Sequence, residues 1–193
     1  VYGGPSKCVL ELTEAVAARN VQIDLVTTNA NGQEALNVEL NRWVSEVGYR
    51  SMYFPSGLFN NEYKCSAEIT RWLWQHIPEY DLVHTNSVFS YPVLPAHLAC
   101  RYHNVPYIMA PHGMLEPWAL SYKANKKRLY YRSVEKPALN HASAVQMLAA
   151  SEAKNVKNLG VRAPLVVIPN GIPRAEASIT VNSSLFYLSL IHI

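Results

Sequence analysis

The arrangement of apolar residues along this chain is the feature that most restricts its fold. Short runs rich in β-branched residues, each typical of a strand, alternate with segments whose apolar residues recur at helical spacing. The strand-like runs cover residues 21–27, 81–85, 106–110, 144–148 and 164–168. Such alternation is typical of a parallel sheet whose strands are joined by crossover helices. We therefore predict an α/β fold with helices on both faces of the sheet.

Helices are expected between these runs, at residues 5–19, 66–77, 93–102, 119–140 and after Ser151. Ser66 is placed to cap the second of them, and Pro78 to end it. Residues 43–55 are interpreted as a bent strand region around Gly48, and residues 29–33 as a polar loop. These segments complete the predicted order of elements.

A Rossmann-like domain normally begins with a central strand that runs into a glycine loop. This chain instead opens inside such a loop, at Tyr2-Gly3-Gly4. We therefore expect a Rossmann-like sheet whose first strand is missing. Gly3 and Gly4 stand directly before a helix, where backbone N–H groups can approach a phosphate or a sugar hydroxyl, although a plain turn is the more usual explanation of an isolated Gly-Gly pair.

Composition limits the domain count and the compartment. With 193 residues, 49% of them hydrophobic and 16% charged, the chain can bury one core and is too short for two full-sized domains. Three widely spaced cysteines form neither a zinc-site pattern nor a disulfide framework, so a reducing cytoplasm is expected. No secretory start is visible, and the longest apolar run is about half of the ~20 residues that a spanning helix needs.

Polar residues follow the predicted strands, at the edge of an α/β sheet where ligands bind. His112 and Gly113 follow residues 106–110, and a neutral histidine there can hydrogen-bond a sugar hydroxyl or shuttle a proton, since its ring both donates and accepts, so His112 is the candidate catalytic residue. His84 lies at the end of residues 81–85 and is followed by Asn86, so this polar pair faces the same edge. Either histidine can instead be a structural one, with His112 capping loop backbone and His84 hydrogen-bonded in the core.

A basic and aromatic segment lies at residues 122–132, with the cations Lys123, Lys126, Lys127, Arg128 and Arg132. At helical spacing, such a face is suited to anionic lipid head groups. It is equally typical of a solvated helix whose tyrosines pack inward. No nucleic-acid-binding module accompanies it, so no nucleic-acid partner is expected.

Several chemistries lose support from missing patterns. Aspartate occurs only at Asp24 and Asp81, so no Asp-x-Asp pair exists to hold a divalent ion on a nucleotide diphosphate, and no metal site is predicted. The G-x-G-x-x-G, P-loop and G-x-S-x-G patterns are also missing from the sequence, which argues against dinucleotide binding, NTP hydrolysis and serine hydrolysis.

Four segments in order resemble the N-terminal domain of bacterial family 4 glycosyltransferases: Gly3-Gly4-Pro5-Ser6, Tyr80-Asp81-Leu82-Val83-His84, Ala110-Pro111-His112-Gly113-Met114 and Val167-Ile168-Pro169-Asn170-Gly171-Ile172. The resemblance implies a GT-B enzyme with two Rossmann-like domains, which transfers a hexose with retention from a nucleotide-sugar donor to a glycan or lipid-linked acceptor. It implies no metal and no cofactor, the nucleotide sugar being a substrate. Polysaccharide biosynthesis, in the cytoplasm or at the inner face of the cell membrane, is the expected setting.

The resemblance also assigns roles by position. His112 matches the family histidine that contacts the donor sugar, and Gly3 and Gly4 match the loop near the diphosphate and acceptor. Asn170 and Gly171 mark the crossing toward the second domain. His84 matches a strand-end histidine less closely, because family members often carry a further histidine where this chain has Asn86.

The departures from the family pattern concern the end of the chain. Residues 1–172 are interpreted as a partial acceptor-side domain, and residues 173–193 as a tail unrelated to the family, disordered or artefactual. The donor-binding pattern does not follow, so the chain alone is expected to be inactive. Two alternatives remain open: a non-catalytic module that recruits a partner or membrane, and a fragment of a nucleotide-sugar epimerase.

Overall fold

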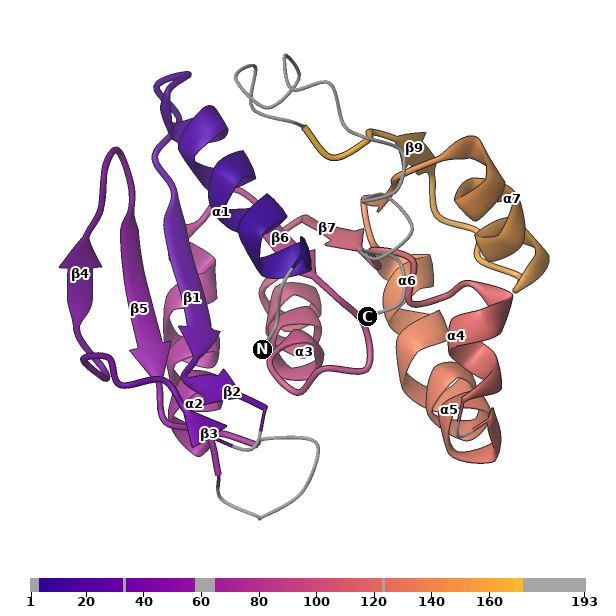
Figure 1. Ribbon diagram of the computed structural model, residues 1–193, viewed down its shortest axis with the longest axis horizontal. Helices are drawn as coiled ribbons and strands as arrows, with labels where there is room; N and C mark the ends of the chain where they lie inside the picture. The colour runs from indigo at the N-terminus through magenta and orange to yellow at the C-terminus, as the bar shows by residue number, and fades with distance from the viewer. Residues whose placement is uncertain (1–3, 33, 58–64, 123, 172–193) are drawn as a thin grey trace, which may run out of the picture.

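The protein is built around a four-stranded parallel sheet, as the alternating pattern predicts. The computed structural model describes residues 4–32, 34–57, 65–122 and 124–171. The sheet has the order β6-β7-β8-β9, with all neighbours parallel (Figure 1). Its strands are β6 (Val83–Asn86), β7 (Tyr107–Ala110), β8 (Ala144–Met147) and β9 (Leu165–Val167). The predicted α/β class is confirmed.

A smaller, mixed sheet contains the earlier strands. β1 (Asp24–Thr28) pairs in parallel with β5 (Arg50–Phe54), which pairs antiparallel with β4 (Trp43–Ser45). The bent strand region is thus a hairpin, and Gly48 lies in its turn with a left-handed φ of 85°. The loop predicted at residues 29–33 is wrong in part, because β2 (Ala30–Asn31) and β3 (Glu34–Ala35) form a short antiparallel pair.

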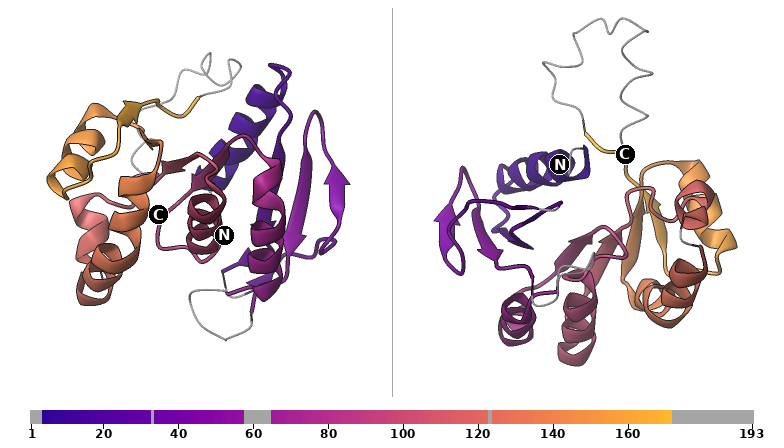
Figure 2. Two further views of the ribbon diagram at one scale, coloured as in Figure 1. Left: turned by 180° about the vertical axis from the view of Figure 1, so that it is seen from behind. Right: turned by 60° about the horizontal axis from the view of Figure 1, so that its bottom comes forward.

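β1 and β6 each lie at the edge of their own sheet, and the two strands are not paired with one another. Helix α1 (Gly4–Ala17) lies over the junction between the sheets, on the side opposite to helix α2 (Ala67–His76) (Figure 2). Within α1 only Thr13 is buried, and all five residues of β1 are half-buried rather than buried. Among the described strands, β1 and β6 therefore each have one edge that no other strand covers.

The other helices largely follow the predicted boundaries. Helix α2 (Ala67–His76) begins as expected, because the Ser66 side chain accepts a hydrogen bond from the Ile69 backbone N–H at 3.4 Å. A 3-10 turn, η1 (Ile77–Glu79), contains Pro78. Helices α3 (Val93–His103) and α7 (Ala150–Asn158) complete this set.

The basic helix predicted at residues 119–140 is divided into four pieces. They are α4 (Pro117–Ser121), α5 (Ala124–Tyr130), a π-helical segment η2 (Tyr131–Glu135) and α6 (Lys136–His141). The π-helical turn coincides with Glu135, a buried carboxylate whose Oε1 accepts a hydrogen bond from the Phe89 backbone N–H at 2.6 Å. Single π-turns of this kind often mark functional positions in helices.

The core joins the parallel sheet to the helices packed on it. Fully buried side chains include Ile69, Ile77, Met109, Leu139, Val145 and Met147. His97 is the buried histidine of this core, where its ring stacks on Tyr107 and its Nε2 lies 2.9 Å from the Thr85 hydroxyl. Burial lowers the pKa of His97 to about 4, so this ring is neutral at pH 7.

Three sequence predictions fall on parts of the chain for which no structure is described. Gly3, Lys123 and the tail at residues 173–193 lie outside the described residues. Among the helices that are described, none has the length and apolar character needed to span a bilayer.

Candidate active site

Strand register brings two of the predicted site residues together at the carboxyl edge of the parallel sheet. In the β6–β7 pair Asn86 lies opposite Ala110, and His112 follows two residues later. Side chains alternate along a strand, so His84 and Asn86 share one face while Thr85 points into the core. The His112 loop therefore reaches the face that carries His84 and Asn86.

The His112 ring is held by a hydrogen bond to Asn86. Nε2 of His112 lies 2.9 Å from Oδ1 of Asn86. An amide oxygen only accepts, so Nε2 carries the proton and Nδ1 of the neutral ring carries a lone pair. Nδ1 is buried and has no hydrogen-bond partner among the residues that the structure describes. The ring thus keeps one acceptor unused beside the sheet edge.

Burial determines the charge of this ring. The pKa of His112 is lowered from its ordinary value because burial disfavours the imidazolium, and the nearby Glu152 carboxylate opposes this shift only in part. At pH 7 His112 is neutral, with separate donor and acceptor nitrogens. Such a ring can orient a hydroxyl group without contributing a charge.

The backbone at His112 is left-handed, with φ of 51° at His112 and 76° at Gly113. A histidine in this conformation is uncommon and needs support from its surroundings. A Cβ placed on Gly113 would meet nothing within 4 Å, so space remains next to the loop. The loop is thus a tight, supported turn with one open side.

Glu152 supplies that support, although the sequence analysis did not assign it a role. This carboxylate, in the first turn of α7, is buried. Oε1 accepts from the Gly113 N–H at 2.8 Å and Oε2 from the Leu148 N–H at 2.6 Å. It joins the ends of β7 and β8 to α7. An acidic residue in the first helical turn after a strand was the only sequence signal for it.

His84 lies on the same face as Asn86 and keeps contact with solvent. Its pKa is lowered, first because part of the ring is desolvated and second because of the neighbouring His112. The two rings are therefore close enough to influence one another. His84 is therefore not a core histidine. The buried histidine next to this strand is His97 of α3.

The loop after β6 is fixed by Met114 of the loop after β7 and by Glu135 of η2. Ser87 and Phe89 have left-handed φ values of 87° and 58°. The Ser87 hydroxyl donates to the sulfur of Met114 at 3.1 Å, and the Phe89 N–H donates to buried Glu135. The loops that follow β6 and β7 are thus bound to one another on either side of the Asn86–His112 pair.

The remaining site candidates lie apart from this pair in the described contacts. Gly4 begins α1 and is exposed, with nothing within 4 Å of a Cβ placed on it. Asn170 and Gly171 are exposed beyond β9. Within the described ranges, no hydrogen bond or ion pair joins these three residues to His112. Across the described part of the chain, no group of three His, Cys, Asp or Glu side chains is arranged to hold a metal ion.

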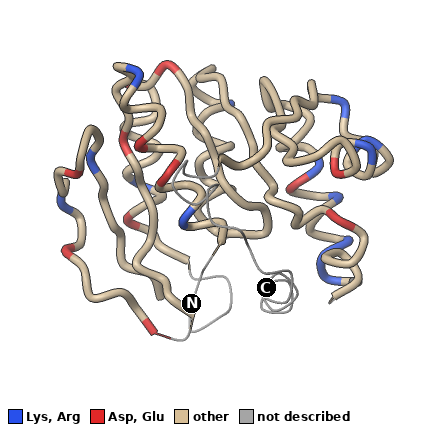
Figure 3. Tube along the Cα trace, turned by 45° about the horizontal axis from the view of Figure 1, so that its top comes forward, with Lys and Arg blue, Asp and Glu red and all other residues tan. Residues whose placement is uncertain are grey.

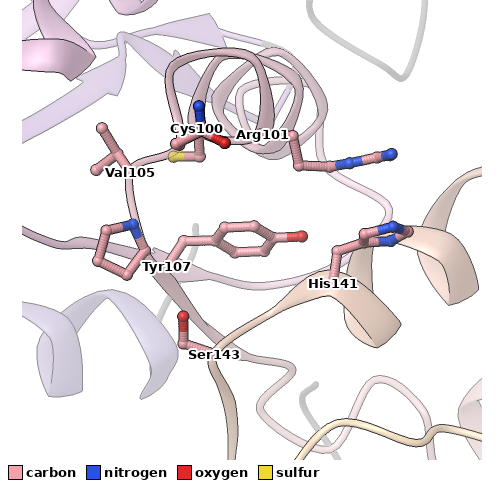
Figure 4. Close-up of a pocket in the computed structure, with 8 residues that line it drawn as sticks. Cys100, Arg101, Val105, Tyr107, His141 and Ser143 are labelled. Carbon is pink, nitrogen blue, oxygen red and sulfur yellow. The ribbon is translucent and has the colours of Figure 1, made fainter.

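A cavity of about 500 Å³ lies at the opposite edge of the sheet (Figure 4). It is lined by residues at the start of β7, before β8 and at the ends of α3 and α6, among them Cys100, Arg101, Tyr107, His141 and Ser143. The Tyr107 hydroxyl donates to the Ala138 carbonyl at 2.6 Å. The cavity therefore does not include the polar residues that follow β6 and β7.

The chain matches one known protein family over most of its length. A family model described as Glycosyltransferase Family 4 matches residues 2–176. The chain belongs to glycosyltransferase family 4. The match includes the Asn86–His112 pair and both loops around it. A comparison of this family 4 chain with curated protein sequences finds no match.

Solved structures confirm the predicted fold of this family 4 chain. A sucrose-phosphate synthase from Thermosynechococcus elongatus is similar with a TM-score of 0.60 and 17% identity, over 95% of this chain and 93% of that one. HepE from Anabaena, in complex with UDP and glucose, is similar with a TM-score of 0.58 and 17% identity, over 97% of this chain. The match covers 46% of the HepE chain. At this identity the likeness concerns the fold alone.

Proposed function

We propose that this chain forms the acceptor-side lobe of a retaining glycosyltransferase that takes a hexose from a nucleotide sugar. Its family membership and the similarity of its fold to HepE, a protein solved with UDP and glucose, support a nucleotide-sugar donor. The acceptor is a glycan or a lipid-linked sugar. Such a reaction belongs to polysaccharide assembly at the cytoplasmic side of the membrane.

The Asn86–His112 pair carries this proposal. Nε2–H of His112 is occupied by Asn86, and Nδ1 is an unused acceptor. An unpaired buried acceptor costs on the order of 1–3 kcal/mol, which a hydrogen bond from a substrate recovers. A small movement of the left-handed loop at His112 and Gly113 exposes Nδ1 to a sugar hydroxyl, which donates to it. Gly3, Gly4, His84, Gly113, Asn170 and Gly171 are further substrate-binding residues in this proposal, assigned from their positions in the family pattern.

No metal and no cofactor take part in the proposed reaction. The departing diphosphate is stabilised by positively charged side chains of the donor-binding lobe. The matched region covers 46% of the HepE chain, and we propose that transfer needs both lobes. This chain alone is then inactive.

The test is a reconstitution of the two lobes. The chain is mixed with a separately expressed donor-binding domain of a family 4 enzyme, and release of nucleoside diphosphate is measured with a panel of nucleotide sugars and glycan acceptors. We expect release only from the mixture. His112→Ala should lower its rate about five- to tenfold, because a hydrogen bond to an uncharged hydroxyl contributes on the order of 1 kcal/mol.

His141→Ala is the matched control, since His141 is an exposed histidine whose Nδ1 lies 2.8 Å from the Pro137 carbonyl, at the opposite edge of the sheet. Its rate should equal that of the unsubstituted chain. No release with any donor, or equal rates for the two variants, contradicts the proposal.

A further inference from the structure

The helices that follow the His112 loop carry an unusual concentration of positive charge. Residues 117–134 contain five of the chain's seventeen basic residues and none of its fourteen acidic residues. The rest of the chain is therefore net acidic, with twelve basic and fourteen acidic residues. Figure 3 maps these charges on the chain, with α4 to α7 on its right side. The small net charge of +3 is thus unevenly distributed, and residues 117–134 form a strongly basic corner.

Three cations of this corner point into solvent. Lys126, Arg128 and Arg132 are exposed, and none forms an ion pair with a residue that the structure describes. Lys127 has a different role from the one its sequence position indicates. Its Nζ donates to the Ala119 carbonyl at 2.6 Å and lies 5.4 Å from the Phe89 ring centroid. Lys127 therefore joins α5 to α4 and to the loop after β6.

Large apolar side chains are exposed among these cations. Trp118 on α4 is 63% exposed, Tyr122 directly after α4 is 68% exposed, and Leu129 on α5 is 71% exposed. Leu129 lies one helical turn from Lys126 and one turn from Arg132, so they share a surface. The residue of α4 that is buried against the rest of the protein is Ala119. These exposed apolar groups do not serve the core.

This combination matches the chemistry of an anionic bilayer surface. Lys and Arg are attracted to negatively charged head groups, while Trp, Tyr and Leu enter the boundary between head groups and acyl chains. A soluble polyanion would use the charges and leave the apolar side chains in water. Charge and apolar exposure together therefore favour a membrane over a nucleic acid.

We propose that the α4–α5 corner, defined by Trp118, Tyr122, Lys126, Arg128, Leu129 and Arg132, docks the protein on an anionic lipid bilayer. The corner begins directly after the His112 loop, and Lys127 connects it to the loop after Asn86. Docking there brings the Asn86–His112 edge to the head-group level. The acceptor is accordingly a lipid-linked sugar, an inference that rests on the proposed function.

The test is sedimentation of the chain with vesicles. The vesicles contain phosphatidylcholine with or without about a third phosphatidylglycerol. We expect the chain to sediment with the anionic vesicles and to remain in solution with the neutral ones. Lys126→Gln, Arg128→Gln and Arg132→Gln together should weaken binding on the order of a hundredfold, because each cation near such a surface contributes about fivefold. Trp118→Ala with Leu129→Ala should weaken it at least tenfold.

Matched controls use exposed residues elsewhere. Lys154→Gln, Lys157→Gln and Arg162→Gln remove three exposed cations near or on α7, and Val47→Ala with Tyr102→Ala removes apolar groups that are 89% and 72% exposed. Neither control should change vesicle binding by more than about twofold. Equal losses in the controls overturn the proposal, as does no binding by the unsubstituted chain. Binding to heparin that depends on the same cations, without any vesicle binding, overturns it in favour of a soluble polyanion.

Sedimentation needs no donor domain, so this test is separate from the sugar-transfer assay. His112→Ala should bind vesicles like the unsubstituted chain. Vesicle binding without diphosphate release supports the docking surface and contradicts the proposed function. Diphosphate release with soluble glycans and no vesicle binding supports the proposed function and contradicts the docking surface.

Discussion

At the scale of single residues, the closeness of Asn86 and His112 follows from the order of the strands. Asn86 ends β6 and His112 follows the parallel neighbouring strand β7, so that Nε2 of His112 lies 2.9 Å from Oδ1 of Asn86. That proximity was predictable from the sequence because carboxyl ends of parallel strands share an edge. Their hydrogen bond and the unused nitrogen were not, since both depend on the left-handed turn at His112.

Replacing the amide of Asn86 by a carboxylate tests the assigned proton positions. Asn86→Asp places a negative charge beside Nε2 of His112, which favours the imidazolium, so the pKa of His112 should rise from its lowered value. An NMR titration of the histidine ring protons measures the change. A His112 titration unaffected by the substitution would contradict the assigned hydrogen bond.

Glu152 stabilises the backbone of the site through two hydrogen bonds. In Glu152→Ala, the N–H groups of Gly113 and Leu148 both lose a charged acceptor, which should lower the free energy of unfolding by about 3 kcal/mol. Urea denaturation followed by circular dichroism measures it. Glu39→Ala, at an exposed position, should change stability by less than about 0.5 kcal/mol. Equal stability of the two variants would remove the role assigned to Glu152.

At the scale of elements, local patterns predicted the order of strands and helices, and tertiary contacts determined the exceptions. The cap at Ser66 could be predicted because it joins residues only three positions apart, Ser66 and Ile69. The π-helical segment depends on a bond from Glu135 to Phe89, 46 residues earlier, and no local pattern encodes it. Glu152 is likewise bonded to Gly113, 39 residues away. Strand β4 runs antiparallel to β5. The direction of so short a strand is set by the strand it pairs with, so it could not be predicted from the residues of β4 alone.

The π-helical segment makes stability dependent on pH. Burial raises the pKa of Glu135 from 4.5 to about 7. A raised folded-state pKa means that its contribution is complete below pH 4.5 and is lost as the pH rises through 7. Glu135→Gln keeps an oxygen for the Phe89 N–H and never ionises. Relative to the unsubstituted chain, it should gain on the order of 3 kcal/mol of stability between pH 4.5 and 8.

Urea denaturation at a series of pH values follows that gain. The exposed Glu39→Gln should show no comparable change with pH, which separates the effect from a general change in net charge. A constant stability difference for Glu135→Gln across this range would show that Glu135 is not desolvated.

At the scale of the whole molecule, a polar contact joins the two sheets near the starts of β1 and β6. The Tyr80 hydroxyl donates to Oδ2 of Asp24 at 2.6 Å, and Arg50 donates to both oxygens of the same carboxylate at 2.7 Å. The Arg50 hydrogen bond is the main reason that the pKa of Asp24 is lowered. This carboxylate therefore stays ionised and holds both partners.

Tyr80→Phe removes the contact between sheets and leaves the Asp24–Arg50 pair in place. We expect a loss of about 2 kcal/mol in the free energy of unfolding, because the acceptor is charged. Thermal or urea denaturation measures the loss, and Tyr102→Phe, at a site 72% exposed, is the control. If both variants unfold alike, the contact does not hold the sheets together.

Two of the edge strands, β1 and β6, have a consequence for the protein in solution. β1 and β6 each pair on one side only among the described strands, so backbone donors and acceptors of both remain available to a further strand. Another molecule can offer one, and a row of open peptide groups is the usual starting point for such pairing. Light scattering should therefore record growing particle size as the protein is concentrated, and dilution should keep it monomeric.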